Sequence, residues 1–163
     1  HYNPANPQSH RQTAKEIIGD FDGDLGAVIC TTGTGGTISG LSAVLREEIP
    51  GIRIVATEPD NSPILSKGIA CKHRIMGTAP GVIPDTLDQG AYDDIIAVNA
   101  DHAMAVARQL AQREGIFCGI SCGAAVVGML EYAKREEARE RQLLAILADT
   151  GERYLSTELW AST

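Results

Sequence analysis

The sequence predicts an α/β protein in which a mostly parallel β-sheet lies between two layers of helices. Short apolar runs alternate with amphipathic segments along the chain, which is the pattern of parallel strands joined by helices. The apolar runs are nearly continuous, as expected for strands buried on both faces. With 163 residues, the chain is long enough for one domain with a hydrophobic core. We therefore expect a three-layer sandwich.

Four apolar runs are the expected strands, and they cover residues 25–30, 52–59, 94–99 and 142–151. A first helix is expected over 9–18, with Ser9 as its N-cap. A second helix follows a glycine-rich loop and ends at Pro50 and Gly51. At helical spacing it carries Ile38, Leu41, Val44 and Leu45.

The second half of the chain is expected to contain three more helices. A short one is predicted within 62–70, and the loop 76–88 follows it. A longer one is predicted over 101–115, with Asp101 as its cap and Gly115 at its end. Residues 116–140 read as a loop of small residues that runs into the last helix.

Composition excludes several classes of protein. The net charge of −7 disfavours a broad nucleic-acid surface, and an aromatic content of 4% disfavours a platform for stacking bases. No apolar run approaches the roughly 20 residues that span a bilayer, and the first residues lack a signal-peptide pattern. Without CxxC spacing, the cysteines are interpreted as reduced thiols of a cytoplasmic protein: Cys30, Cys71, Cys118 and Cys122.

The stretch CTTGTGGTISG, residues 30–40, is the most informative part of the sequence. It joins a predicted strand to a predicted helix. Glycines allow several backbone N–H groups to point the same way, and a helix N-terminus adds partial positive charge. Since ligands of parallel sheets bind at the carboxyl ends of the strands, three loops are candidates: the one after Cys30, residues 119–123, and the one after Leu147.

Comparison with known sequence patterns of phosphate-binding loops restricts the class of ligand. The dinucleotide pattern GxGxxG fits at Gly33 and Gly35 but has Ile38 at its third small position. The nucleotide P-loop fails as well, because no Gly-Lys-Ser/Thr follows. A smaller phosphorylated ligand remains, and so does the alternative of a tight turn that binds nothing.

Five segments in order resemble the cysteine synthase family, the fold-type II pyridoxal-phosphate enzymes of β-replacement. They read NPANP, TGTGGTISG, TEPDNSPIL, GISCGAA and TGERYLST, and they extend along nearly the whole chain. The resemblance implies the large domain of that fold, with pyridoxal 5'-phosphate as cofactor.

The resemblance also implies roles for individual residues. It assigns the cofactor phosphate to Gly33, Thr34, Gly35, Gly36 and Thr37. Ser121 would face the pyridine nitrogen, and its alternative role is a helix N-cap. A neutral hydroxyl leaves the pyridine largely unprotonated, which weakens the cofactor as an electron sink and favours loss of a β-leaving group.

Three features depart from the family pattern. Cys122 stands where serine is common, and we interpret it as a small buried residue. Asp149 replaces a serine near the pyridine end, where its charge would alter the electrostatics. The loop GTAPGVIP, residues 77–84, differs from the family's usual GIGAGFIP on the substrate side.

The family's Schiff-base lysine and its loop for the substrate carboxylate belong to an N-terminal segment that is absent from these residues. Residues 1–163 are therefore interpreted as the C-terminal, cofactor-binding portion of the large domain, inactive alone. We expect the lysines to be solvated surface groups: Lys15, Lys67, Lys72 and Lys134. The histidines form no spaced cluster, which disfavours a metal site: His1, His10, His73 and His102.

For the full-length enzyme, the resemblance implies that O-acetylserine and sulfide give cysteine and acetate, in a cytoplasmic homodimer that binds an amino-acid substrate. Two alternatives stay open. One keeps β-replacement but uses O-phosphoserine or a nucleophile other than sulfide. The other is an inert domain that holds phosphate or cofactor noncovalently, or pairs with a separate N-terminal piece.

Overall fold

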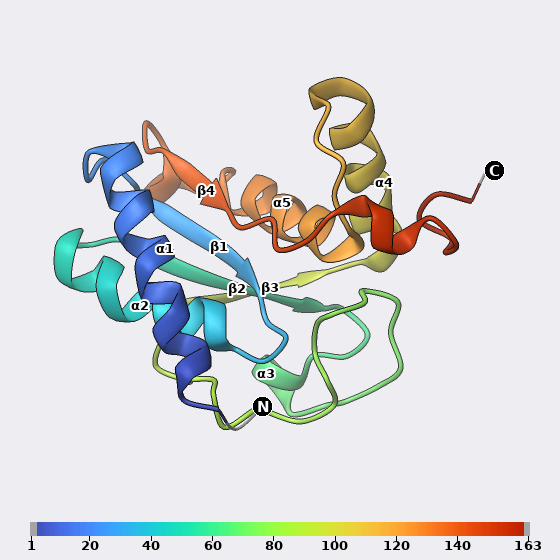
Figure 1. Ribbon diagram of the computed structural model, residues 1–163, viewed down its shortest axis with the longest axis horizontal. Coiled ribbons are helices and arrows are strands. Elements are labelled where there is room, and N and C mark those ends of the chain that lie inside the picture. The colour runs from blue at the N-terminus through green and yellow to red at the C-terminus, as the bar shows by residue number, and fades with distance from the viewer. Residues whose placement is uncertain (1–2, 162–163) are drawn as a thin grey trace.

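The computed structural model describes residues 3–161, in which a four-stranded parallel sheet is flanked by helices on both faces (Figure 1). The expected α/β sandwich is confirmed. Neighbouring strands pair in the order β3-β2-β1-β4. The strands are β1 (Ala27–Thr31), β2 (Arg53–Pro59), β3 (Asp94–Val98) and β4 (Leu143–Ala145).

Five α-helices cover the sheet in the described part of the chain. They are α1 (Ala5–Phe21), α2 (Gly36–Glu48), α3 (Ile64–Lys67), α4 (Ala100–Gln109) and α5 (Ile120–Tyr132). A π-helical turn, Leu110–Glu114, extends α4, and 3-10 turns lie at Glu136–Ala138 and Gly151–Tyr154. None of the helices within residues 3–161 has the length and apolarity needed to cross a bilayer.

The first helix begins earlier than the sequence predicts. It starts at Ala5 after Pro4, so the expected N-cap at Ser9 is wrong. Proline suits the start of a helix because its φ is already helical and its missing N–H would be unpaired there. Ser9 instead lies inside the helix, where its hydroxyl donates to the carbonyl of Asn6 at 2.7 Å.

The cap of α4 also differs from the prediction. Asn99, not Asp101, precedes the helix, and its Oδ1 accepts from the amides of Asp101 and His102 at 3.0 and 3.4 Å. Asp101 lies in the first turn, where its negative charge suits the helix dipole. Gly115 ends the helical segment in the left-handed conformation, as predicted.

The two central strands, β1 and β2, are buried on both faces, which explains their nearly continuous apolar runs. In β1, Ala27 and Ile29 face the core under α4 and α5, whereas Val28 and Cys30 face the core under α1 and α2. Figure 1 shows these helix pairs on opposite sides of the sheet. The last strand, β4, is three residues long and pairs with β1, whereas the sequence predicts a strand over 142–151.

The chain path creates a switch point between β1 and β4. From β1 the chain passes through α2 to β2 and on to β3, and it then returns through α4 and α5 to β4, on the other side of β1. The loops that follow β1 and β4 therefore diverge. A crevice at such a point is the usual ligand site of an open parallel sheet.

Replacing Gly128 by alanine tests how closely α5 packs on the sheet. A Cβ at Gly128 would overlap the Thr57 methyl group and lie 3.3 Å from Ile29 Cγ2. We expect Gly128→Ala to lower the free energy of unfolding by about 1–3 kcal/mol, measured by urea denaturation.

Gly19→Ala is the matched control, because no atom lies within 4 Å of a Cβ built there on α1. This change should stabilise the protein by about 0.5–1 kcal/mol through helix propensity. Equal stability of Gly128→Ala and the unchanged protein would contradict the packing argument.

Candidate functional site

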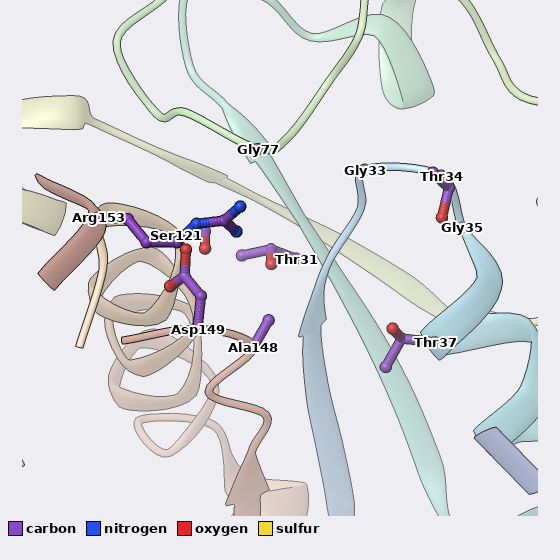
Figure 2. Close-up of a pocket in the computed structure, with 10 residues that line it drawn as sticks. All are labelled: Thr31, Gly33, Thr34, Gly35, Thr37, Gly77, Ser121, Ala148, Asp149 and Arg153. Carbon is purple, nitrogen blue, oxygen red and sulfur yellow. The ribbon is translucent and has the colours of Figure 1, made fainter. Parts of the chain in front are cut away.

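A cavity of about 250 Å³ lies at the switch point. The three loops selected from the sequence as candidate ligand sites all contribute residues to it. Figure 2 shows Ser121, Asp149 and Arg153 on one side and Gly33, Thr34 and Gly35 on the other. The lining residues are Thr31, Gly33, Thr34, Gly35, Thr37, Gly77, Ser121, Ala148, Asp149 and Arg153.

The loop after β1 presents hydrogen-bond donors to this cavity. Gly35 is the N-cap of α2 and has a φ of 79°, a conformation that favours glycine. The amide of Ser39 is the first to bond back into the helix, to the Gly35 carbonyl at 3.0 Å. The amides just before it are left without helical partners, and the positive end of the helix dipole adds to them. Together with the hydroxyls of Thr34 and Thr37, these groups could hold an anion, and we call this set of groups the cradle.

The loop 76–88 packs against this cradle. A Cβ at Gly33 would overlap the carbonyl oxygen of Gly77, and one at Gly35 would overlap Leu87. The Thr86 hydroxyl donates to the carbonyl of Thr34 at 2.5 Å. The glycines therefore meet a packing requirement of their own, in addition to the exposure of amides.

Gly36 differs from the other predicted phosphate-loop residues. It does not line the cavity. A Cβ there would overlap the side-chain amide of Asn6 on α1, and the Gly36 amide donates to Thr34 Oγ1 at 3.4 Å. Gly36 thus supports the cradle through packing and through Thr34.

Ser121 lies in the first turn of α5, on the opposite wall. Its alternative role as helix N-cap is wrong, because Gly119 holds that position. The residue is only 5% exposed, and it lines the cavity together with Asp149 and Arg153. A Cβ at Gly119 would overlap the Asp149 carboxylate, so only glycine allows the two loops to approach this closely.

Both carboxylate oxygens of Asp149 have donors. Tyr154 donates its hydroxyl to Oδ2 at 2.5 Å, and Cys122 lies with its sulfur 3.2 Å from Oδ1. Burial first, and then the hydrogen bond to Asp149, raise the pKa of Tyr154, so this hydroxyl stays protonated. Cys122 is fully buried, as expected of a small packed residue.

A second thiol acts on Cys122. The hydrogen bond from Cys118 lowers the pKa of Cys122 to about 7, in opposition to burial, and the same bond raises the pKa of Cys118. Cys30 is buried elsewhere, and Cys71 is exposed.

The structure keeps the lysines away from the cavity. Lys15, Lys67, Lys72 and Lys134 are all exposed, and none of them lines it. Among the histidines, His10 lies 3.3 Å from the Thr37 hydroxyl through its Nε2. His1 lies outside the described residues, within which no group of metal-binding side chains is found.

Four lining residues were not predicted from the sequence. Thr31 is the last residue of β1, and Ala148 comes after β4. Their positions could have been inferred, because ligands of parallel sheets bind at these strand ends. Arg153 lies in the segment TGERYLST, which resembles the family, but the resemblance implies no role for this side chain. Gly77 carries no local signal, because its place depends on how a long loop folds back over the sheet.

Comparison with family models and curated proteins gives one consistent result. The model of the family described as "Pyridoxal-phosphate dependent enzyme" matches residues 1–149. A cysteine synthase of Staphylococcus aureus (strain N315) is 44% identical over 161 residues, which cover 98% of this chain and 52% of the relative. A probable cysteine synthase of Bacillus subtilis (strain 168) is 44% identical over 163 residues, with the same shares. The chain spans about half the length of the curated relatives it matches.

Solved structures agree. An O-ureido-L-serine synthase has a TM-score of 0.93 and 44% identity, covering 99% of this chain and 51% of its own. The cysteine synthase of Entamoeba histolytica has a TM-score of 0.95 and 37% identity, covering 99% of this chain and 48% of its own.

The Tyr154–Asp149 bond should contribute measurably to stability. Tyr154→Phe removes a donor to a partly buried carboxylate, and we expect it to lower the free energy of unfolding by about 1–3 kcal/mol. Tyr92→Phe, at a half-buried tyrosine that does not line the cavity, is the control and should change it by less than about 0.5 kcal/mol. Equal effects of the two changes in urea denaturation would show that the bond to Asp149 adds little.

Proposed function

The chain belongs to the cysteine synthase family of pyridoxal-phosphate dependent enzymes, and we therefore propose that the full-length protein catalyses β-replacement. The reaction proposed is O-acetylserine plus sulfide to cysteine plus acetate, with pyridoxal 5'-phosphate as cofactor. One observation carries the proposal: four residues of the loop after β1 line the same cavity as Ser121, although more than 80 positions separate them from it. They are Gly33, Thr34, Gly35 and Thr37.

The residues present fit this cofactor. It combines a dianionic phosphate with a flat pyridine ring. The loop after β1 offers amides without helical partners and the hydroxyls of Thr34 and Thr37 as donors for the phosphate. Close packing around the loop leaves no room for a Cβ at Gly33 or Gly35. Ser121 offers a neutral hydroxyl on the opposite wall.

When bound, the cofactor supplies the electron sink for loss of the β-substituent. The chain's own residues then have three tasks. The cradle binds the phosphate and so orients the ring. Ser121 places its neutral hydroxyl next to the ring nitrogen, and that nitrogen therefore stays largely unprotonated. Asp149 lies on the same wall, and each of its two carboxylate oxygens accepts a hydrogen bond, from Cys122 and from Tyr154.

The lysine that carries the cofactor is assigned to a part of the protein outside these residues. The four lysines of the chain are exposed and do not line the cavity, which supports this assignment. On the same family resemblance we propose a cytoplasmic homodimer that binds an amino-acid substrate. Sedimentation that shows only monomer at high protein concentration would contradict the dimer.

The full protein, supplied with cofactor, O-acetylserine and sulfide, should form cysteine and acetate in equal amounts. O-Phosphoserine and hydroxyurea, offered in place of the donor and of sulfide, test the alternatives that keep the chemistry. The second is included because an O-ureido-L-serine synthase is as similar to this chain as the curated cysteine synthases are. Cofactor binding without turnover of any of these pairs would favour an inert binding domain.

A polypeptide of these 163 residues should bind the cofactor but form no cysteine. A positioned acid–base group is worth about 10²–10⁴-fold in rate, and none of the exposed lysines can supply it. Borohydride reduction should attach no stoichiometric cofactor to the polypeptide. Cysteine formation together with such attachment at Lys15, Lys67, Lys72 or Lys134 would show that the catalytic lysine was misassigned.

A further inference from the structure

The N-terminal helix lies directly against the phosphate cradle. Asn6 and His10 are one turn apart on α1, and each reaches a hydroxyl of the loop. Asn6 Nδ2 donates to Thr34 Oγ1 at 3.0 Å, and His10 Nε2 lies 3.3 Å from Thr37 Oγ1. Both threonines line the cavity, whereas neither α1 residue does so.

Two glycines of α2 allow this contact. Gly36 and Gly40 are also one turn apart, and they face α1. A Cβ at Gly36 would overlap the Asn6 amide, and one at Gly40 would overlap the Pro7 carbonyl and lie 2.8 Å from His10 Cβ. The close approach of the two helices therefore brings the Asn6 side chain to the cradle.

Hydrogen-bond accounting at Thr34 gives the direction of its hydroxyl hydrogen. A hydroxyl oxygen has two acceptor sites and one hydrogen to donate. Thr34 Oγ1 accepts from Asn6 Nδ2 at 3.0 Å and from the Gly36 amide at 3.4 Å. Neither of these nitrogens can accept, so the hydrogen of Thr34 must be donated elsewhere, and Thr34 lines the cavity.

We propose that Asn6 is a positioning residue for phosphate binding: with the Gly36 amide it fills the acceptor sites of Thr34, and it thereby turns the Thr34 hydroxyl hydrogen toward the ligand's phosphate. This inference rests on the proposed function. His10 stands in a similar relation to Thr37, but its ring nitrogen can donate or accept, so Asn6 carries the inference.

The test compares pyridoxine 5'-phosphate with pyridoxine, which differ in the phosphate alone and carry no aldehyde that could react with surface lysines. Calorimetric titration gives the affinity of the purified protein for each. Asn6→Ala should weaken binding of pyridoxine 5'-phosphate about five- to tenfold, the effect of one net hydrogen bond, and leave pyridoxine binding unchanged. Gln8→Ala, at an exposed position of the same helix, should change neither.

Asn6→Asp is a nearly isosteric second variant, and it decides the matter if Asn6→Ala does not fold. Its carboxylate accepts the Thr34 hydrogen instead of donating, and it adds negative charge beside the phosphate. The loss of affinity for pyridoxine 5'-phosphate should therefore exceed that of Asn6→Ala, again with no loss for pyridoxine.

A double-mutant cycle separates positioning from simple support of the fold. In a Thr34→Val background, Asn6→Ala should cause no further loss of affinity for pyridoxine 5'-phosphate, because the hydroxyl through which it acts is gone. Independent, additive losses, or equal losses for both ligands, would overturn the inference. If the unchanged protein bound pyridoxine 5'-phosphate no more tightly than pyridoxine, the proposed function itself would fail.

Discussion

The close packing around Gly33–Gly36 is the constraint on which the rest of the site depends. None of the three glycines of this loop has room for a side chain: the Gly77 carbonyl lies against Gly33, Leu87 against Gly35 and Asn6 against Gly36. These contacts come from the loop 76–88 and from α1, so two distant parts of the chain hold the loop in one conformation. Because the loop is held, its amides and hydroxyls need little rearrangement to meet an anion, which lowers the cost of binding.

This packing joins two explanations that the sequence left as alternatives. A glycine-rich strand-to-helix turn can serve close packing or can expose amides to a ligand. Here Gly33 and Gly35 do the first and line the cavity as well, whereas Gly36 supports the loop from outside the cavity. Because these glycines have no Cβ, neighbouring segments can pack directly against the loop, while the loop still lines the cavity.

The opposite wall depends on a second close approach, that of Gly119 to Asp149. The carboxylate was an unexpected charge in the sequence, and its electrostatic effect could not be judged without its partners. Tyr154 and Cys122 each donate to one of its oxygens, so hydrogen bonds within the protein stabilise its charge. Ser121 remains as the uncharged hydroxyl of this wall, which is the chemistry that the family resemblance implies.

The amino-acid pattern was sufficient to predict the layers, the parallel strands and the three loops that line the cavity. Burial on both faces leaves a continuous apolar run in each strand, and the carboxyl ends of parallel strands meet at one edge, so local patterns were sufficient. The resemblance added Thr34, Thr37 and Ser121, which all line the cavity.

Which groups support those residues follows from contacts between segments that are distant in the sequence. Three features have no periodic signal in the sequence: the start of α1, the contact of Asn6 with Thr34 across 28 positions, and the place of Gly77. They follow from how closely one helix packs on another and how a long loop folds back. A local sequence pattern records which face of an element is buried, but the partner of a polar side chain depends on segments that meet only in the folded protein.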